Sequence, residues 1–333
     1  MVYLKYGLIF FSALLLSIGL VPVCAFFSKK LGILDQPDDK LKKHARAVPY
    51  FGGVAIYLAF FITLVIYQLY TFHTLKGITG IILAGSLAFA LGLADDIKKL
   101  SIPFKFCVQI LAAILLAIFG IKIQFMSSEI LNIAVTILWV VGITNAFNLL
   151  DIMDGLSSGV AIIASLTFFV LGLDAGKLFS PLAALALAGS CLGFLYYNYA
   201  PAKIFMGDAG SLFIGIMLAA LSLTESYTYK NNLAVLTPVF ILGIPIFDTF
   251  FVMWMRAKQG KPVYFGSPDH FPLRMKRSGM TVRQVVTAIY FAAAAFAVVA
   301  YTGTKMSLLR AGIMYTFVCM FSMLAALKLS RMR

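Results

Sequence analysis

The residues best suited to chemistry lie in a polar stretch, residues 145–159 (NAFNLLDIMDGLSSG), that follows a long apolar run. Within ten residues it holds two amides, Asn145 and Asn148, and two carboxylates, Asp151 and Asp154. Carboxylates at the edge of a membrane are costly and usually serve a site. If the stretch is helical, these two are neighbours on one face, because they are three positions apart. The alternative is a polar helix end capped by Asn and Asp side chains.

Two more acidic motifs stand at the ends of other apolar runs. Asp95 and Asp96 are adjacent, and two lysines follow closely. Such a pair could bind Mg2+ with a phosphate or act as a base, because adjacent like charges raise one pKa unless a cation compensates. Asp208 lies between two glycines where a new apolar helix begins. A hard oxygen donor there suits Mg2+, which takes one or two carboxylates plus substrate phosphates. The alternatives are a solvated loop for the pair and an N-cap for Asp208.

Basic residues supply the groups that a phosphate needs. An early loop places Lys43, His44 and Arg46 just before a turn rich in Pro and Gly. Such a loop could hold a phosphate or diphosphate by charge and by close backbone approach. A later loop sets His270 and Arg274 one helical turn apart, and arginine is suited to bidentate phosphate binding. The alternative for both is a basic loop that only orients the chain in the membrane.

Two single residues are further candidates. Asp248 lies inside an apolar run (IPIFDTFFV), and a lone intramembrane Asp is a functional candidate by default. Its alternative is a structural pairing with a basic neighbour. Phe205, three residues before Asp208, could stack on a nucleobase.

The composition shows what kind of chain has to position these motifs. Of 333 residues, 62% are hydrophobic and 12% charged, and the mean hydropathy is +0.97. Soluble proteins are about half apolar and a quarter charged, so the sequence predicts an all-α polytopic membrane protein. The net charge of +14 would suggest nucleic acid in a soluble protein. Here the Lys and Arg lie mainly in short loops, so orientation of the chain in the membrane and binding of anionic ligands explain the charge better. We therefore expect no nucleic-acid partner. The four cysteines lie in apolar runs without metal-ligand spacing and are interpreted as packing residues.

About eleven apolar segments approach the roughly 20 residues that a helix needs to cross the hydrocarbon. The eighth is short, and the ninth contains Pro238 and Pro245. The segments are residues 6–27, 51–70, 77–94, 103–121, 131–147, 155–173, 180–198, 210–224, 233–255, 284–302 and 309–328. We interpret residues 1–333 as one integral-membrane domain.

The loops alternate between a basic side and a side poor in charge, which predicts the orientation. One side carries 20 of the 27 Lys and Arg and ten of the 13 Asp and Glu. Basic loops stay in the cytoplasm, so we expect the N-terminus outside and the C-terminus inside. The polar motifs then meet on the cytoplasmic face. Together they offer carboxylates for a metal and cations for phosphates, which is what phosphoryl transfer needs.

With these motifs in place, the sequence resembles the polyprenyl-phosphate N-acetylhexosamine-1-phosphate transferases, the WecA/MraY family. The resemblance runs from the first loop to about residue 285. The first family motif stands as Asp35, Pro37, Lys43, His44, Pro49, Gly52 and Gly53. The Asp-Asp pair is Asp95 and Asp96, and the Phe-Met-Gly-Asp-x-Gly-Ser motif is intact at residues 205–211. The Asn-x-x-Asn-x-x-Asp-Gly-x-Asp-Gly motif is Asn145, Asn148, Asp151, Asp154 and Gly155, with Ile152 in place of its first Gly.

The resemblance implies a reaction. A polyprenyl phosphate, usually undecaprenyl phosphate in bacteria, attacks the β-phosphate of a UDP-sugar, and the products are polyprenyl-diphosphate-sugar and UMP. The step initiates a cell-surface glycan, such as lipopolysaccharide or teichoic acid. It requires Mg2+, with Mn2+ as a substitute. The resemblance also implies a multi-pass protein of the inner or plasma membrane, an active site on the cytoplasmic face and a homodimer.

The same resemblance implies residue roles. Asp95, Asp96 and Asp151 are the expected catalytic residues, and Asp208 and Asp151 the expected metal ligands. The expected substrate-binding residues are Lys43, His44, Arg46, Asn148, Asp154, Phe205, His270 and Arg274. Asp95 is the candidate base, although a phosphate monoester has a second pKa of about 6 and is largely dianionic without help. A double displacement through an aspartyl-phosphate is the alternative mechanism.

Three features favour UDP-GlcNAc over UDP-MurNAc-pentapeptide as the sugar donor. They are the eleven predicted spans, the Ile-Phe-Asp-Thr run at Asp248, and a fifth loop with Ser-Pro-Asp and no double His. The GlcNAc-type enzymes carry a His-x-His-His-Arg run, whereas this chain has only His270 and Arg274 there. The pentapeptide transferase and another acetamido sugar therefore stay open. A secondary transporter is the alternative from another class, but no repeated halves are visible and the acids gather on one face.

Overall fold

The apolar segments form helices, because a backbone in hydrocarbon must satisfy its hydrogen bonds within its own segment. The computed structural model divides into two compact units, residues 1–225 and 226–333, which are described separately. The expectation of one domain therefore stays a prediction. Lys43, His44 and Arg46 lie outside the described residues. The structure describes residues 2–35, 47–71, 76–262 and 267–332.

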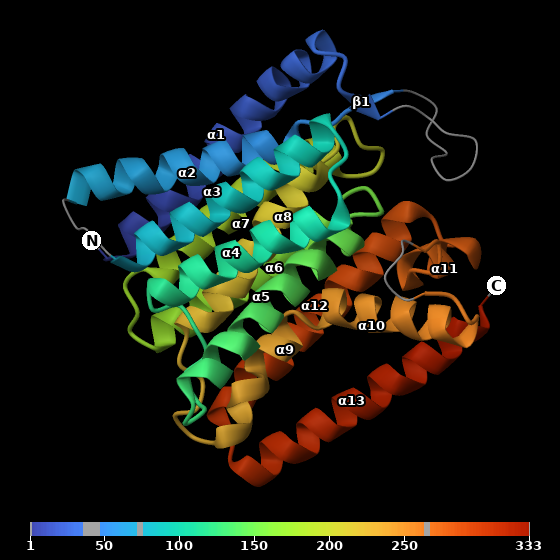
Figure 1. Cartoon of the computed structure of the whole chain (residues 1–333). Helices are drawn as coiled ribbons and strands as arrows, with labels where there is room; N and C mark the ends of the chain where they lie inside the picture. Colours follow the sequence, from blue (N-terminus) through green and yellow to red (C-terminus); the bar gives the residue numbers. More distant parts are fainter. Residues whose placement is uncertain (1, 36–46, 72–75, 263–266, 333) are drawn as a thin grey trace. The chain divides into compact units, whose positions relative to one another are not determined.

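In its described residues, the first unit is a bundle of eight helices with one small antiparallel ribbon (Figure 1). The helices are α1 (Val2–Lys30), α2 (Gly52–Thr71), α3 (Lys76–Ile97), α4 (Ile102–Ile118), α5 (Glu129–Leu150), α6 (Leu156–Asp174), α7 (Ser180–Asn198) and α8 (Gly207–Thr224). The ribbon pairs β1 (Leu34–Asp35) with β2 (Val48–Pro49) at the loop that carries the first motif.

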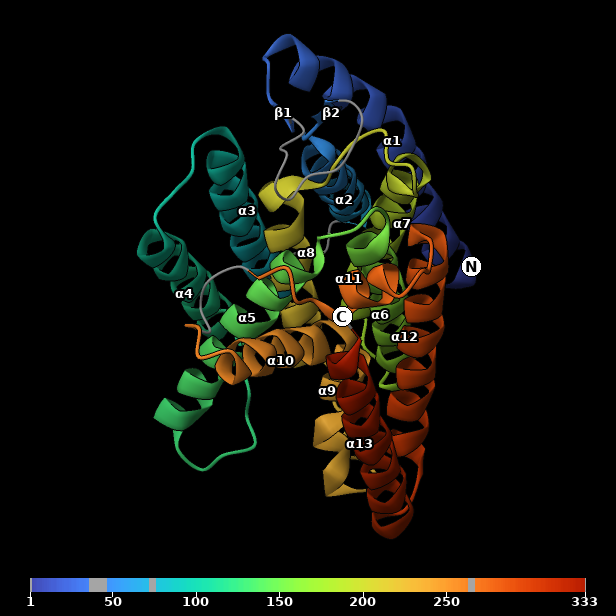
Figure 2. The same ribbon diagram turned by 90° about the vertical axis from the view of Figure 1, so that its right-hand side faces the viewer.

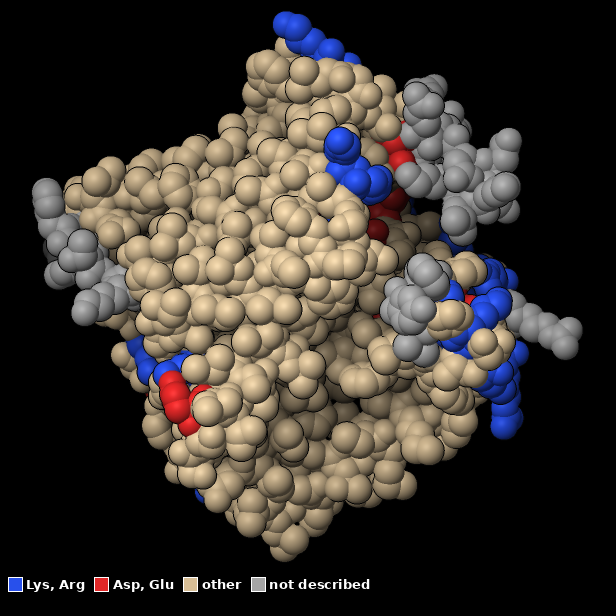
Figure 3. All heavy atoms as spheres, viewed as in Figure 1, with Lys and Arg blue, Asp and Glu red and all other residues tan. Residues whose placement is uncertain are grey.

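Helix α8 is the centre of this bundle, and nearly all of its residues are buried. It packs against α2, α3, α5, α6 and α7, while α1 and α6 lie against α7 (Figure 2). Its sequence is rich in Gly, Ala and Ser, and small residues let helix backbones approach closely in a membrane. The outer surface of the helices is apolar: Figure 3 shows a broad area over them without Lys, Arg, Asp or Glu side chains.

The second unit contains a broken segment followed by two long helices. Its elements are η1 (Asn232–Leu236), α9 (Thr237–Ile241), α10 (Gly243–Lys258), α11 (Phe271–Arg277), α12 (Val282–Lys305) and α13 (Leu308–Arg331). The part from η1 to α10 bends by 75° next to Leu242. Pro238 and Pro245 flank this bend, and each lacks the N–H that a continuous helix would use there.

The all-α membrane fold is confirmed. Within the described residues, nine helices are long and apolar enough to cross a membrane, and the bent pair α9–α10 would be a tenth. The remaining predicted span corresponds to α4, an apolar helix of 17 residues, at the lower limit for crossing. The number eleven stays a prediction at that helix, and the orientation of the termini stays a prediction as well.

Candidate active site

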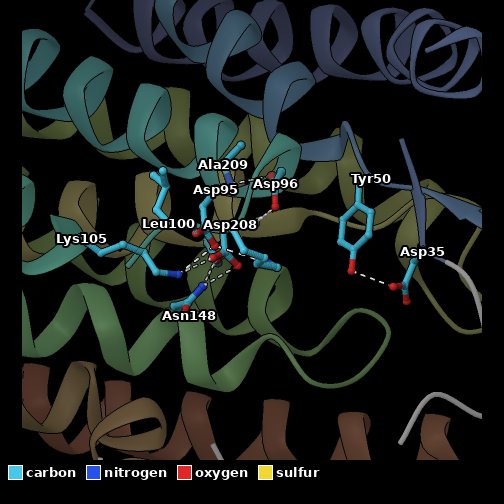
Figure 4. Close-up of polar contacts among 11 residues, drawn as sticks. Asp35, Tyr50, Asp95, Asp96, Leu100, Lys105, Asn148, Asp208 and Ala209 are labelled. Atoms are coloured by element: carbon cyan, nitrogen blue, oxygen red, sulfur yellow. Dashed lines mark hydrogen bonds and ion pairs between the residues drawn. The ribbon is translucent and has the colours of Figure 1, made fainter. Parts of the chain in front are cut away.

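A lysine ammonium joins two of the predicted carboxylates. Asp95 lies in the last turn of α3 and is completely buried. Its Oδ2 accepts a hydrogen bond from Lys105 Nζ at 2.8 Å, and its Oδ1 accepts one from the Leu100 backbone N–H at 2.7 Å. The same Nζ donates to Asp208 Oδ2 at 3.2 Å. Lys105, in the first turn of α4, thus bridges the acids of α3 and α8 (Figure 4).

Asp96 has a different environment from its neighbour. Its two carboxylate oxygens accept the backbone N–H groups of Asp208, at 2.8 Å, and Ala209, at 3.0 Å (Figure 4). A negative charge is favourable at a helix N-terminus, where the first N–H groups lack partners inside the helix. Gly207 opens this helix with φ of 72°, and a Cβ there would lie 2.5 Å from the Asp96 carboxylate. Asp96 therefore fixes the start of α8, and with it the backbone of Asp208.

Helix α5 brings an amide and a further carboxylate. Asn148 Nδ2 donates to Asp208 Oδ1 at 3.1 Å and to Ser211 Oγ at 2.9 Å. Asp208 thus has Asn148 on one oxygen and Lys105 on the other. Asp151 follows as the C-cap of α5. Desolvation raises the pKa of Asp151 to about 7, and the negative charges of neighbouring carboxylates, Asp208 first among them, act in the same direction.

The backbone of Asp208 is also positioned by close packing against the backbone of α3. A Cβ on Gly92 would lie 2.2 Å from the Asp208 carbonyl oxygen, so only glycine fits there. Gly92 precedes Asp95 by about one turn of α3. The acids of α3 are therefore held within reach of the first turn of α8 by direct contact of the two helices.

The loop before α8 is fastened to the first motif. Phe205 donates its N–H to the Pro49 carbonyl at 2.8 Å, and its own carbonyl accepts the Gly52 N–H at 3.0 Å. The rings of Tyr50 and Phe205 meet edge to face at 6.2 Å. The Tyr50 hydroxyl donates to Asp35 Oδ1 at 2.8 Å (Figure 4). The predicted base-stacking residue thus lies beside the described part of the first motif.

The turn after α5 is tied to this same loop. Asp154 Oδ2 accepts the Ala202 N–H at 2.9 Å. Asn198, buried at the end of α7, accepts the Gly155 N–H at 2.9 Å and donates to the Ile204 carbonyl at 2.9 Å. Asn198 was not among the predicted site residues, although an Asn that ends an apolar run was a usable signal. The first unit therefore assembles Asp95, Asp96, Asn148, Asp151, Asp154, Phe205 and Asp208 into one connected site.

In the second unit, Asp248 has a basic partner. His270 Nδ1 lies 2.6 Å from Asp248 Oδ2, and the Phe271 N–H donates to Asp248 Oδ1 at 3.1 Å. Asp248 and His270 are both buried. Of the two interpretations of Asp248, pairing with a basic neighbour is the arrangement present, and it anchors the start of α11 to α10.

Arg274 is engaged by its own chain. Its Nη2 donates to Asp269 Oδ1 at 2.7 Å, and its Nη1 donates to the carbonyls of Met332, at 2.6 Å, and Ser330, at 3.3 Å. The guanidinium thereby fastens α11 to the end of α13. The predicted phosphate-binding role of Arg274 would require some of these donors to change partners, and it stays a prediction.

Comparison with known proteins shows the family of the chain. The sequence model of the family described as "Glycosyl transferase family 4" matches residues 78–226, from α3 to just past α8. A Bacillus subtilis (strain 168) protein described as "Probable undecaprenyl-phosphate N-acetylglucosaminyl 1-phosphate transferase" is 35% identical over 290 residues, which cover 84% of this chain and 80% of the relative. The chain belongs to glycosyl transferase family 4.

Two further relatives carry different names. The "Undecaprenyl-phosphate alpha-N-acetylglucosaminyl 1-phosphate transferase" of Thermotoga maritima is 32% identical over 256 residues, covering 77% of this chain and 76% of the relative. The "Phospho-N-acetylmuramoyl-pentapeptide-transferase" of Prochlorococcus marinus is 33% identical over 259 residues, covering 68% of this chain and 70% of the relative. The resemblance inferred from the motifs is confirmed.

Lys105 is the main site residue that the sequence analysis missed. It was counted only as one cation of a basic loop, whereas it lies 3.2 Å from an acid 103 positions away. The available signal was a lysine in the first turn of an otherwise apolar helix (IPFKFCVQIL). Such a residue inside a membrane protein is a functional candidate by default.

The donor set suits a hard divalent cation. In the part of the chain that the structure describes, no three His, Cys, Asp or Glu side chains converge as a complete metal cage. Mg2+ seldom uses such a cage, since it binds one or two carboxylates together with substrate phosphates and water. The ammonium of Lys105, held between Asp95 and Asp208, shows that the site stabilises positive charge at that point. The oxygens present therefore fit Mg2+.

Proposed function

We propose that this chain transfers GlcNAc-1-phosphate from UDP-GlcNAc to undecaprenyl phosphate. The products would be undecaprenyl-diphosphate-GlcNAc and UMP, and the step would initiate a cell-surface glycan. One observation carries the proposal: carboxylates from α3 and α8 share a cation, and an amide from α5 holds the same α8 carboxylate. This arrangement suits charge neutralisation at a diphosphate, and the names of the Bacillus and Thermotoga relatives support the sugar.

The reaction needs alignment more than covalent chemistry. An oxygen of the lipid phosphate forms a bond to the β-phosphorus, the bond to the bridging oxygen breaks, and UMP leaves with that oxygen. The lipid phosphate is largely dianionic at neutral pH, so no strong base is required. Asp95 is bonded to Lys105 and to a backbone N–H, which supports a role in holding this lysine for a phosphate. Asp96 acts through the backbone of Asp208, as a positioning residue.

We propose Mg2+ as the resident cofactor, with Mn2+ as a substitute. Asp208 and Asp151 would hold it, since both lie at the junction of α5 and α8. Bound there, the ion would neutralise charge on the diphosphate of the donor. Asn148 would orient the Asp208 carboxylate toward it, because the amide already fixes one of its oxygens.

The substrate-binding assignments are part of the same proposal. Phe205 would stack on the uracil, and its edge-to-face contact with Tyr50 supports a fixed ring orientation. Asp154 would contact the uracil with the oxygen that does not accept the Ala202 N–H. His270 and Arg274 stay the proposed phosphate-binding residues of the fifth loop. We further propose an inner or plasma membrane location, a cytoplasmic site and a homodimer.

The test is a transfer assay on purified protein with undecaprenyl phosphate and Mg2+. Parallel reactions contain UDP-GlcNAc, UDP-GalNAc or UDP-MurNAc-pentapeptide, and Asp208→Asn is the control. We expect UMP release with UDP-GlcNAc only, abolished by EDTA and by the substitution. Turnover of the pentapeptide donor alone would replace the proposed sugar with that of the Prochlorococcus relative. Uptake of a solute into proteoliposomes, without turnover of any donor, would favour a transporter.

A further inference from the structure

An amide pair joins α4 to α5 one turn away from the candidate site. Asn145 Nδ2 donates to Gln109 Oε1 at 2.7 Å, and Gln109 Nε2 donates to Asn145 Oδ1 at 3.4 Å. The same Asn145 amide donates to the Val141 carbonyl at 2.8 Å. Gln109 is only 2% exposed, although it lies in an otherwise apolar helix. A buried amide without a partner would be costly, so this pair specifies which residues face each other.

Helix geometry connects the pair to both side chains that hold Asp208. Gln109 lies four residues after Lys105 on α4, and Asn145 lies three residues before Asn148 on α5. Residues at these spacings are neighbours on one helix face, about one turn apart. The amide pair therefore lies directly behind the two donors to Asp208.

Helix α4 has few neighbours that could fix its position along its own axis. It has 17 residues, and its substantial packing is against α3 and α5. Much of its remaining surface consists of exposed apolar side chains, among them Phe104, Ile110 and Leu111. Apolar contacts are not directional, so they leave sliding along the helix axis cheap, whereas paired amides accept only one register.

We propose that Gln109 and Asn145 are positioning residues for Lys105. Their reciprocal hydrogen bonds set the axial register of α4 against α5, so that Lys105 Nζ stands between Asp95 and Asp208. This inference rests on the proposed phosphotransferase function. A shift of α4 would move the ammonium away from the acids, and a misplacement of about 1 Å can lower turnover about 100-fold.

The first experiment separates positioning from general stability. Gln109→Leu, Asn145→Leu, the double variant, and the exchanged pair Gln109→Asn/Asn145→Gln are assayed for kcat, KM and thermal stability in detergent. Ser222→Ala is the matched control, since it removes the acceptor of the Trp139 Nε1–H, a 2.8 Å bond between α5 and α8.

We expect Gln109→Leu to lower kcat about 10- to 100-fold with little change in KM for the donor. The kcat of the double variant should be no lower than that of the less active single variant, because each single substitution already removes the same interaction. The exchanged pair should recover much of the loss, since it restores two amides. Ser222→Ala should lower stability while kcat stays within about twofold of wild type, the range of an interaction outside the reacting centre. Equal kcat in wild type and a folded Gln109→Leu variant would overturn the proposal.

The second experiment asks whether the amide pair acts through Lys105. Gln109→Leu is introduced into Lys105→Met, and residual turnover is compared. If the pair only positions Lys105, Gln109→Leu causes no further loss of turnover in the Lys105→Met background. A loss equal to the product of the two single losses would overturn the proposal. If Lys105→Met has no measurable turnover, the exchanged pair decides, and absence of recovery overturns it. Inactive wild type with every donor would instead reject the proposed function, so the two failures are distinguishable.

Discussion

Replacing Lys105 by methionine removes the cation that two acids share. The ammonium lies 2.8 Å from Asp95 Oδ2 and 3.2 Å from Asp208 Oδ2, and methionine keeps most of the side-chain volume. Without it, two carboxylates from different helices lose the cation that they share. We therefore expect a protein that folds, is less stable without a divalent cation, and turns over slowly.

The structure sets the size of the effect. Asp95 is fully buried, while the Lys105 and Asp208 side chains are each 23% exposed. Breaking a fully buried pair costs about 3–5 kcal/mol. An exposed pair is worth about 0–1 kcal/mol. The intermediate burial points to a loss of about 2 kcal/mol in the free energy of unfolding. Losing a charge that stabilises a transition state lowers kcat about 100- to 1000-fold.

The assay compares thermal unfolding in EDTA and in Mg2+, together with turnover. Lys99→Met is the matched control: Lys99 approaches the same Asp95 Oδ2 at 3.4 Å, but its side chain is 82% exposed. We expect little change for Lys99→Met and a clear loss for Lys105→Met in EDTA. Mg2+ should stabilise Lys105→Met more than wild type, because in wild type the Lys105 ammonium already compensates the two carboxylates. Equal stability of the two lysine variants in EDTA would refute this reasoning.

Three further predictions follow from close packing and burial. Gly92→Ala should reduce stability and turnover together, because its Cβ would lie 2.2 Å from a backbone oxygen of α8, whereas Gly142→Ala, with open space around it, should be tolerated in both measurements. Burial opposes ionisation of Asp269, yet its bonds to Arg274 and Gln259 hold its pKa below the ordinary value. Arg274→Gln should therefore lower the melting temperature at neutral pH. The difference should become smaller in acid melts below about pH 4, where the Asp269 carboxylate takes up its proton, and the part due to the Ser330 and Met332 carbonyls should remain. Burial raises the pKa of Glu225 to about 7. Ionising Glu225 in the folded protein therefore costs stability, and the cost is complete above about pH 7. Glu225→Gln should stabilise the protein by up to about 3 kcal/mol at pH 8 and not at pH 4, which melting curves at the two pH values would measure.

Much of the fold was predictable because hydropathy and helix formation are local properties. The apolar segments became helices, and the two prolines of the ninth segment stand at a bend of 75°. The clustering of acids from α3, α5 and α8 was also predictable, since each acid ends or begins an apolar run. What the sequence could not show was the partner of each group.

The missed features are long-range contacts between ordinary residues. Lys105 looked like one more loop cation, and only the packing of α4 brings it to Asp208. Asp248 had two open interpretations, because its partner His270 follows 22 residues later through a loop without a regular period. Arg274 looked like a phosphate ligand, yet it reaches the carbonyl of Met332, 58 positions away. Residue type indicated the chemistry in each case, but tertiary structure chose the partner.

The adjacent acids Asp95 and Asp96 show why the site needs both. Successive residues of a helix point about 100° apart, so one helix end can serve two neighbours. Asp95 receives the Lys105 ammonium and the Leu100 N–H, while Asp96 receives the first N–H groups of α8. Each charge is compensated by a different element, which removes the repulsion that adjacent carboxylates would otherwise suffer. One acid can thus hold the Lys105 ammonium while the other fixes the backbone of Asp208, and neither task could pass to its neighbour without turning the helix.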